Sequence, residues 1–314
     1  MTTNNGFTPG LEGVVAAETA LSHVDGLKGE LIIAGFPLAE LAAKATFEEA
    51  TYLLWHGRLP TQTELDDLKQ ELAALRPLPS ATLNLLREAA QVHTTPMDAL
   101  RMAAATLDLG SSHTDPVTTG KMVVARVATI VASYHRLRQG QPLLTPDATL
   151  GHAANYLYLL TGERPSEARV RGLETYFNTV IDHSLNASTF AARVIVATQT
   201  DLVSAITGAI GALKGPLHGG APGPALETVF EIGSADRAEA VLQAKLDAGE
   251  RLMGFGHRVY KVRDPRAEVL GAAAADLLVE QILCNERGVP RHPKLVMTAG
   301  VWRPAATAAA SRAG

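Results

Sequence analysis

The sequence predicts an all-α fold with a short N-terminal β-hairpin, and three observations support this. Leucines recur at helical spacing between Leu65 and Leu75, behind a capping box of Thr61 and Glu64. A longer apolar face predicts one long helix that ends near Gly140, formed by Val123, Val127, Ile130, Val131, Tyr134 and Leu137. Prolines separate these patterns from further helical segments. We expect those helices at residues 47–56, 81–92, 97–108, 149–161, 166–181, 187–213 and 235–248.

One β element is expected, early in the chain. Thr19–Val24 and Glu30–Ile33 have strand-like residues, and Asp25-Gly26 between them favours a turn. The glycines at 208, 211 and 215 would let a helix approach another backbone closely, either at an interface or in a crowded core. The hairpin is therefore a small addition to a helical protein.

Composition and charge argue against several classes of function. The chain has 314 residues, of which 46% are hydrophobic and 19% charged, as in ordinary globular proteins. Its net charge of −4 and the lack of a Lys/Arg cluster argue against a nucleic-acid partner. Cys284 is the single cysteine, so neither an internal disulfide nor a cysteine-based zinc site is expected. No apolar run approaches the roughly 20 residues of a membrane span, and no signal peptide is seen. We expect a cytoplasmic protein without a membrane partner.

Three polar segments interrupt the helical pattern. They are Asp182–Thr189 (DHSLNAST), Lys214–Ala221 (KGPLHGGA) and Gly254–Lys261 (GFGHRVYK), the last followed by Asp264-Pro265-Arg266. His218 and His257 stand beside glycines, which let a ligand approach the backbone. A neutral imidazole can donate to a carbonyl or enolate oxygen, and Arg266 can grip a carboxylate with two hydrogen bonds. These residues together indicate a site for an anionic carbonyl compound.

Each of these segments also has a structural interpretation. A single histidine in a helical protein is more often a packed or surface residue than a ligand-binding one. His-Gly-Gly could cap a helix, Gly-Phe-Gly-His could form a turn, and Arg266 could lie in the first turn of a new helix. Nucleotide motifs fail, since Val259 replaces the third glycine of a dinucleotide fingerprint and Met122 follows Gly120-Lys121.

Longer strings decide between these interpretations. DHSLNASTFAARV, GALKGPLHGGAPG and MGFGHRVYKVRDPRAEVL resemble three signature regions of the citrate synthase family, which includes the methylcitrate synthases. The resemblance continues upstream through ETALSHVDGLKGEL, FEEATYLLWHGRLP and MDALRMAAATLDL, and covers roughly residues 11–280. It implies a citrate-synthase-like two-domain helical fold. The large helical domain is expected at 8–218, a truncated small domain at 219–285 and a divergent tail at 286–314.

The resemblance also implies a role for each matching residue. His183 resembles the histidine that helps to bind oxaloacetate, and Arg266 resembles an arginine that binds an oxaloacetate carboxylate. His218 resembles the histidine that stabilises the acetyl-CoA enol, and His257 the one that polarises the oxaloacetate ketone. The positions that resemble CoA contacts of the family are Gly254, Phe255, Gly256 and Lys261.

The function implied is the tricarboxylic acid cycle reaction of an acyltransferase, citrate synthase, which condenses acetyl-CoA with oxaloacetate and water to give citrate and CoA. Acetyl-CoA is a substrate, so no cofactor and no metal are expected, and the expected assembly is a homodimer. A 2-methylcitrate synthase that uses propionyl-CoA is the nearest alternative, because one methylene changes binding by only about 1–3 kcal/mol. A non-catalytic homologue is the alternative from another class.

The resemblance breaks near the C-terminus. The family's third catalytic group is a carboxylate in an Asn-Val-Asp/Glu-Phe-Tyr-like string after the Asp-Pro-Arg motif, and this sequence has no such string. After Glu286 there is no Asp or Glu, and the end is rich in Ala, Arg, Pro and Gly, as out-of-frame translation from about residue 281 would explain. Ala34 also stands where many relatives carry arginine. We therefore expect little synthase activity from this chain.

Overall fold

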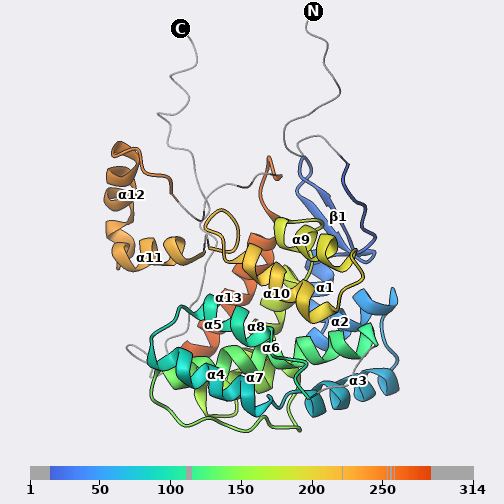
Figure 1. Ribbon diagram of the computed structural model, residues 1–314. Coiled ribbons are helices and arrows are strands. Elements are labelled where there is room, and N and C mark those ends of the chain that lie inside the picture. Colours follow the sequence, from blue (N-terminus) through green and yellow to red (C-terminus); the bar gives the residue numbers. More distant parts are fainter. Residues whose placement is uncertain are drawn as a thin grey trace, which may run out of the picture.

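The computed structural model describes residues 15–110, 115–220, 222–252, 254, 257 and 259–283 (Figure 1). Within these residues one small sheet accompanies many helices, which confirms the predicted class. The strands are β1 (Ser22–Asp25), β2 (Glu30–Ile33) and β3 (Phe36–Pro37). The helices are α1 (Leu38–Lys44), α2 (Phe47–His56), α3 (Gln62–Leu75), α4 (Ser80–Gln91), α5 (Pro96–Ala104), α6 (Pro116–Arg138), α7 (His152–Thr161), α8 (Glu167–Val180), α9 (Ala187–Val196), α10 (Leu202–Leu213), α11 (Pro222–Ile232), the 3-10 turn η1 (Ala235–Arg237), α12 (Ala238–Asp247) and α13 (Pro265–Leu283).

The long helix α6 is the axis of the main body. Asp115 caps its start by accepting a hydrogen bond from the backbone N–H of Thr118 at 2.7 Å, and Gly140 follows its end in a left-handed conformation. Helices α3, α4, α5, α7 and α10 pack around it. Met122 and Ile130 of α6 are buried in a core shared with α4, α5 and α10. The predicted long helix and its stop are confirmed.

The hairpin forms a second core with the helices that follow it. β1 pairs antiparallel with β2, from Ser22 opposite Ile33 to Asp25 opposite Glu30, and the short β3 extends the sheet beyond the predicted hairpin. Ile33 packs with apolar residues of α1 and α2 and with Val269 of α13. This core ties the N-terminal sheet to the helix that follows the Asp-Pro-Arg motif.

Several elements depart from the expectations. α1, α11 and β3 were not expected, and the segment 187–213 forms two helices instead of one. The break comes where Gln199 has a positive φ of 64° and Asp201 caps α10 by accepting from the N–H of Ser204. The two helices then fold onto each other. A Cβ on Gly208 would lie 2.2 Å from Cδ1 of Ile195, so this glycine serves close packing between α9 and α10 within the chain.

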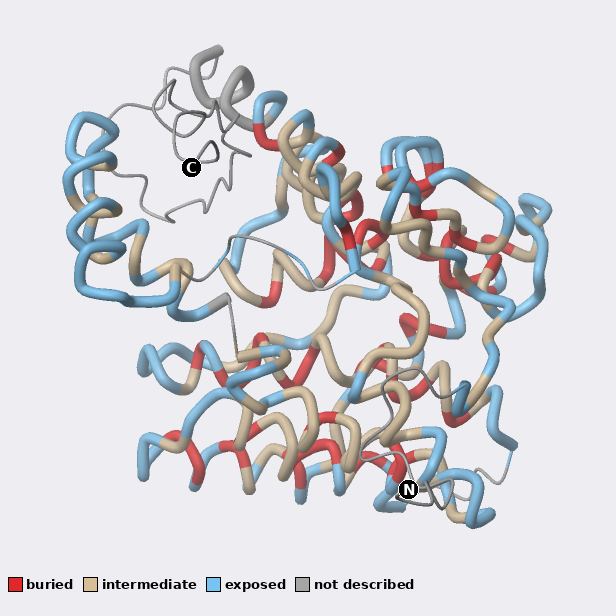
Figure 2. Tube along the Cα trace, turned by 90° about the horizontal axis from the view of Figure 1, so that it is seen from above, coloured by how far each residue is buried: buried red, intermediate tan, exposed pale blue. Residues whose placement is uncertain are grey.

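Helices α11 and α12 lie apart from the main body in both views (Figures 1 and 2). They contact each other, and α12 has no buried residue. Helix α13, although it falls in the expected small domain, packs against α1 and α8 of the main body. The division into domains at residues 218 and 219 stays a prediction.

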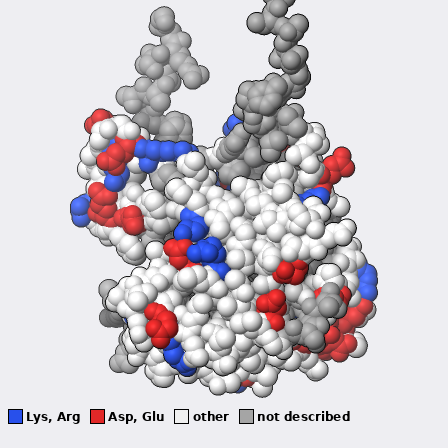
Figure 3. Space-filling model, viewed as in Figure 1, with Lys and Arg blue, Asp and Glu red and all other residues white. Residues whose placement is uncertain are grey.

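The surface carries mixed charge. On the face shown in Figure 3, Lys and Arg are interspersed with Asp and Glu, without an extended region of one sign. Among the helices of the described residues, none is long and apolar enough to cross a membrane.

Candidate active site

The segment 182–186 forms a loop between α8 and α9, and its polar residues build that loop. The backbone N–H of Ser184 donates to Oδ1 of Asp182 at 3.1 Å and to Oγ of Ser22 in β1 at 2.7 Å. Ser184 has a positive φ of 61°, which the two acceptors help to hold. Asn186 then caps α9 by accepting from the N–H of Thr189 at 2.9 Å. His183 is thus held, half-buried, in a loop anchored to the sheet.

The segment 259–263 lies directly against the turn of the hairpin. The N–H of Lys261 donates to the carbonyl oxygen of Gly26 at 2.8 Å. A Cβ on Gly26 would lie 2.3 Å from the carbonyl oxygen of Val259, and one on Gly29 would lie 2.8 Å from that of Arg263. Only glycine allows so close an approach of two backbones. The hairpin turn therefore sets the position of the residues that precede the Asp-Pro-Arg motif.

This arrangement gathers three of the predicted residues around one tyrosine. The ring centroids of His183 and His257 are 5.4 Å apart in an edge-to-face contact. The phenol oxygen of Tyr260 lies 3.0 Å from Nε2 of His183, and its ring centroid is 4.9 Å from that of His257. The guanidinium carbon of Arg266 lies 5.7 Å from the centroid of the same tyrosine ring. Residues about 80 positions apart in the sequence thus form one cluster.

Arg266 is held by a neighbouring carboxylate. Its Nε and Nη2 donate to Asp264 at 3.0 and 2.6 Å, and Oδ1 of Asp264 also accepts from the backbone N–H of Arg266. The last bond caps α13, with Pro265 at its first position. Burial raises the pKa of Asp264, but the hydrogen bonds and charge of Arg266 outweigh it and hold that pKa below its ordinary value. Asp264 thus occupies the Nε and Nη2 edge of the guanidinium, and among the described residues no hydrogen bond is found from Nη1.

The two histidines of the cluster are set up as neutral donors. Nδ1 of His257 accepts from the backbone N–H groups of Val259 and Tyr260 at 3.1 and 3.3 Å, so the neutral ring carries its proton on Nε2. Desolvation and the charge of Arg266 lower the pKa of His257. Burial, Arg266 and His257 lower the pKa of His183 in the same way. Near neutral pH both rings can donate without a charge of their own.

His218 lies in a tight turn after α10 and joins the loop between α8 and α9 by another route. Its Nε2 lies 2.9 Å from Oγ of Ser188, which donates to Oδ1 of Asn186. A Cβ on Gly219 would lie 2.5 Å from the carbonyl oxygen of Leu213, so the turn requires a small residue there. The ring contacts and hydrogen bonds of the described residues do not join His218 to His257. The structure therefore brings three of the predicted residues together, whereas His218 is bonded to Ser188 at the start of α9 and not to the cluster.

The positions expected to contact CoA are only partly described. Gly254 has a φ of 90°, and a Cβ there would lie 3.2 Å from Cβ of Ala225 in α11. Phe255 and Gly256 lie outside the described residues. Lys261 is exposed, with its backbone fixed on the hairpin turn. Of the described positions, Gly254 therefore lies against α11, whereas Lys261 lies on the hairpin turn of the main body.

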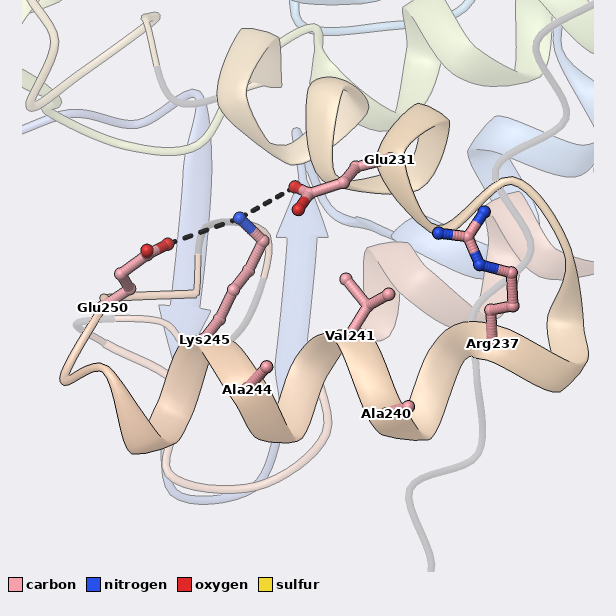
Figure 4. Close-up of a pocket in the computed structure, with 7 residues that line it drawn as sticks. All are labelled: Glu231, Arg237, Ala240, Val241, Ala244, Lys245 and Glu250. Carbon is pink, nitrogen blue, oxygen red and sulfur yellow. Dashed lines mark hydrogen bonds and ion pairs between the residues drawn. The ribbon is translucent and has the colours of Figure 1, made fainter.

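Tyr260, Asp264 and Ser188 take part in these contacts, and sequence reasoning assigned none of them a role in binding or catalysis. All three stand inside the quoted strings, so their positions could have been singled out, but their contacts could not. Two surface hollows in the described part of the chain lie away from this cluster. One of about 440 Å³ separates α11 and α12, where Lys245 bonds to Glu231 and Glu250 at 2.8 and 3.3 Å (Figure 4). In the described part of the chain no three His, Cys, Asp or Glu side chains gather as metal ligands would.

Known proteins are similar to this chain in sequence and in fold. The family model for the citrate synthase C-terminal domain matches residues 10–286. A citrate synthase of Haloferax volcanii is 43% identical over 89% of this chain and 80% of its own length, and a 2-methylcitrate synthase of Mycobacterium tuberculosis is 41% identical over 84% and 68%. A citrate synthase of Thermoplasma acidophilum, solved with carboxymethyl coenzyme A and oxaloacetate, superposes with a TM-score of 0.80 at 29% identity, over 88% of this chain and 74% of that one. The chain therefore belongs to the citrate synthase family.

Proposed function

We propose that this chain is a citrate synthase-type acyltransferase whose site binds oxaloacetate and acetyl-CoA and condenses them, with one water, to citrate and CoA. The observation that carries this proposal is the cluster of His183, His257 and Arg266, in which two neutral donors and one cation converge. The relative solved with oxaloacetate and a CoA analogue supports the choice of ligands. The reaction needs no cofactor besides these substrates.

The roles follow from the chemistry of each group. The free edge of Arg266 binds a carboxylate, and Asp264 holds the guanidinium for it. Nε2–H of His257 donates to the ketone oxygen, where negative charge develops during carbon–carbon bond formation. His218 would donate to the thioester oxygen and so stabilise the enol, but none of these residues is the base that takes up the methyl proton. Movement of α11 and α12 toward the main body would bring the acyl-CoA to the cluster.

Propionyl-CoA is a second candidate substrate, which would make the enzyme a 2-methylcitrate synthase. The Mycobacterium tuberculosis relative of that name is almost as similar to this chain as the citrate synthase of Haloferax volcanii. A pocket that differs by one methylene discriminates by about 1–3 kcal/mol. Competition of the two acyl-CoAs in one assay would rank them.

We further propose that two copies associate in the cytoplasm as a homodimer. Helix α9 has an apolar sequence but no buried residue, and Val194 and Val196 on it are exposed. Tyr176 and Val180 of α8 are exposed as well. A second copy would cover such surface. The two domains at 8–218 and 219–285 belong to the same proposal.

Titration calorimetry with oxaloacetate tests the site assignment. We expect the folded chain to bind oxaloacetate, and Arg266→Gln to weaken binding by about 10- to 100-fold because a charge-assisted pair is lost. Arg87→Gln, on the exposed face of α4, is the control and should bind as the parent does. A folded parent without binding at millimolar oxaloacetate would overturn the assignment.

A further inference from the structure

Tyr260 contacts every member of the cluster. Its side chain is 4% exposed, although it belongs to an exposed segment at the hairpin turn. Its hydroxyl reaches His183 at 3.0 Å, and its ring touches the ring of His257 and the guanidinium of Arg266. A buried phenol with this set of neighbours serves more than packing.

The direction of the hydrogen bond follows from the chemistry of the pair. Burial and the charge of Asp264 raise the pKa of the Tyr260 hydroxyl, so it keeps its proton. Burial and Arg266 lower the pKa of His183, so its ring is neutral. A phenol is a better donor than acceptor, and the unprotonated imidazole nitrogen is the better acceptor. The bond therefore runs from the Tyr260 O–H to Nε2 of His183.

We propose that Tyr260 is the positioning residue of this site, which holds His183 as the Nδ1–H tautomer through its hydroxyl and supports His257 and Arg266 with its ring. His183 then donates from Nδ1, while His257 donates from Nε2. The two rings, which are in edge-to-face contact, thus carry their protons on different nitrogens: Nδ1 in His183 and Nε2 in His257. The identity of the ligand rests on the proposed function, whereas the tautomer does not.

The tautomer is measurable without any ligand. Nitrogen-15 spectra of histidine-labelled protein report which ring nitrogen is protonated, and the His183 signals are those lost in His183→Gln. We expect a protonated Nδ1 and an unprotonated Nε2 in the parent. Tyr260→Phe should shift His183 toward the Nε2–H form, which free imidazole side chains favour. An unchanged tautomer in Tyr260→Phe would overturn the proposal.

Tyr134→Phe is the matched control. Tyr134 is 3% exposed, and its hydroxyl donates to the carbonyl oxygens of Thr94 and Ala89 in the α6 core. Tyr134→Phe and Tyr260→Phe each remove a hydroxyl from a buried tyrosine, so the control reproduces the loss of stability that such a removal causes. The His183 tautomer should stay as in the parent, and a shift there would show that the effect in Tyr260→Phe is not specific.

Oxaloacetate binding then connects the tautomer to function. Tyr260→Phe should weaken binding by about fivefold to tenfold, the effect of one hydrogen bond, and Tyr134→Phe should leave it unchanged. Unchanged binding in Tyr260→Phe would overturn the positioning role even if the tautomer shifts. If the parent itself does not bind oxaloacetate, the proposed function fails, while the tautomer still decides whether Tyr260 positions His183.

Discussion

Single residues in the main body also carry unusual ionisation. Glu174 of α8 is 9% exposed, and Arg171 donates to it at 3.2 Å. Burial raises the pKa of Glu174 to about 7, the charge of Arg171 opposes this, and the nearby Glu48 adds to it. The neighbouring His152 is buried against Phe47, and burial lowers its pKa to about 4. Burial at the junction of α2, α7 and α8 thus favours the neutral forms of Glu174 and His152.

Glu174→Gln should stabilise the protein at high pH and not at low pH. Between the ordinary pKa of 4.5 and the folded value of about 7, the folded state binds more protons than the unfolded state, so stability falls as pH rises. The shift corresponds to roughly 3 kcal/mol above pH 7. Urea unfolding of parent and variant at pH 5 and pH 8 measures the difference. Exposed Glu167→Gln is the control, and an equal effect of Glu174→Gln at both pH values would refute this account.

At the scale of elements, the contact between the hairpin turn and the segment 259–263 places the site. Gly26→Ala puts a Cβ onto the carbonyl oxygen of Val259, and a backbone cannot yield as a flexible side chain can. We expect a loss of about 1–3 kcal/mol in stability, as for other overpacked sites, together with weaker oxaloacetate binding, because Tyr260 and His257 move.

Gly120→Ala in α6 is the control for that prediction. A Cβ there would lie 3.8 Å from Leu202, in ordinary contact, and alanine favours a helix over glycine. Thermal unfolding and calorimetry of both variants make the comparison. If Gly26→Ala keeps parental stability and affinity, the hairpin turn does not position the site.

For the molecule as a whole, binding and turnover should separate. The residues proposed to bind oxaloacetate are gathered in the main body, whereas the expected Asn-Val-Asp/Glu-Phe-Tyr-like string with its carboxylate is not found in the 314 residues. Asp264 is engaged by Arg266 and caps α13, so it does not replace that base. Loss of a general base commonly lowers rates by about 10²–10⁴-fold.

We therefore predict that this 314-residue chain binds oxaloacetate but releases CoA slowly. A chimaera that continues with a family C-terminus after about Leu278 should turn over faster. An assay that couples CoA release to a thiol reagent compares the two. Turnover by the unmodified chain at the rate of an intact family member would contradict the prediction and require another base.

Periodicity and capping residues in the sequence were sufficient to predict the helices that depend on short-range interactions. Apolar periodicity placed α2 at residues 47–56, and the Thr61 and Glu64 capping box fixed the start of α3, where both reciprocal bonds are present. These signals lie within one or two helical turns. The seven-residue α1 and the two-residue β3 are too short to show a hydrophobic period, so the sequence did not predict them. The break between α9 and α10 at Gln199 was not predicted, because apolar residues continue on both sides of it.

For the site, the sequence identified candidate residues and the tertiary structure showed which of them lie in contact. The quoted strings identified His183, His257 and Arg266, since these residue types carry the chemistry wherever they lie. Only the tertiary structure showed that Tyr260 joins them, because the hydroxyl of Tyr260 meets a ring 77 residues earlier in the chain. That meeting depends on the hairpin turn at Gly26, which touches the segment 259–263. Contacts between distant residues come from the packing of whole elements, and no local pattern in the sequence encodes them.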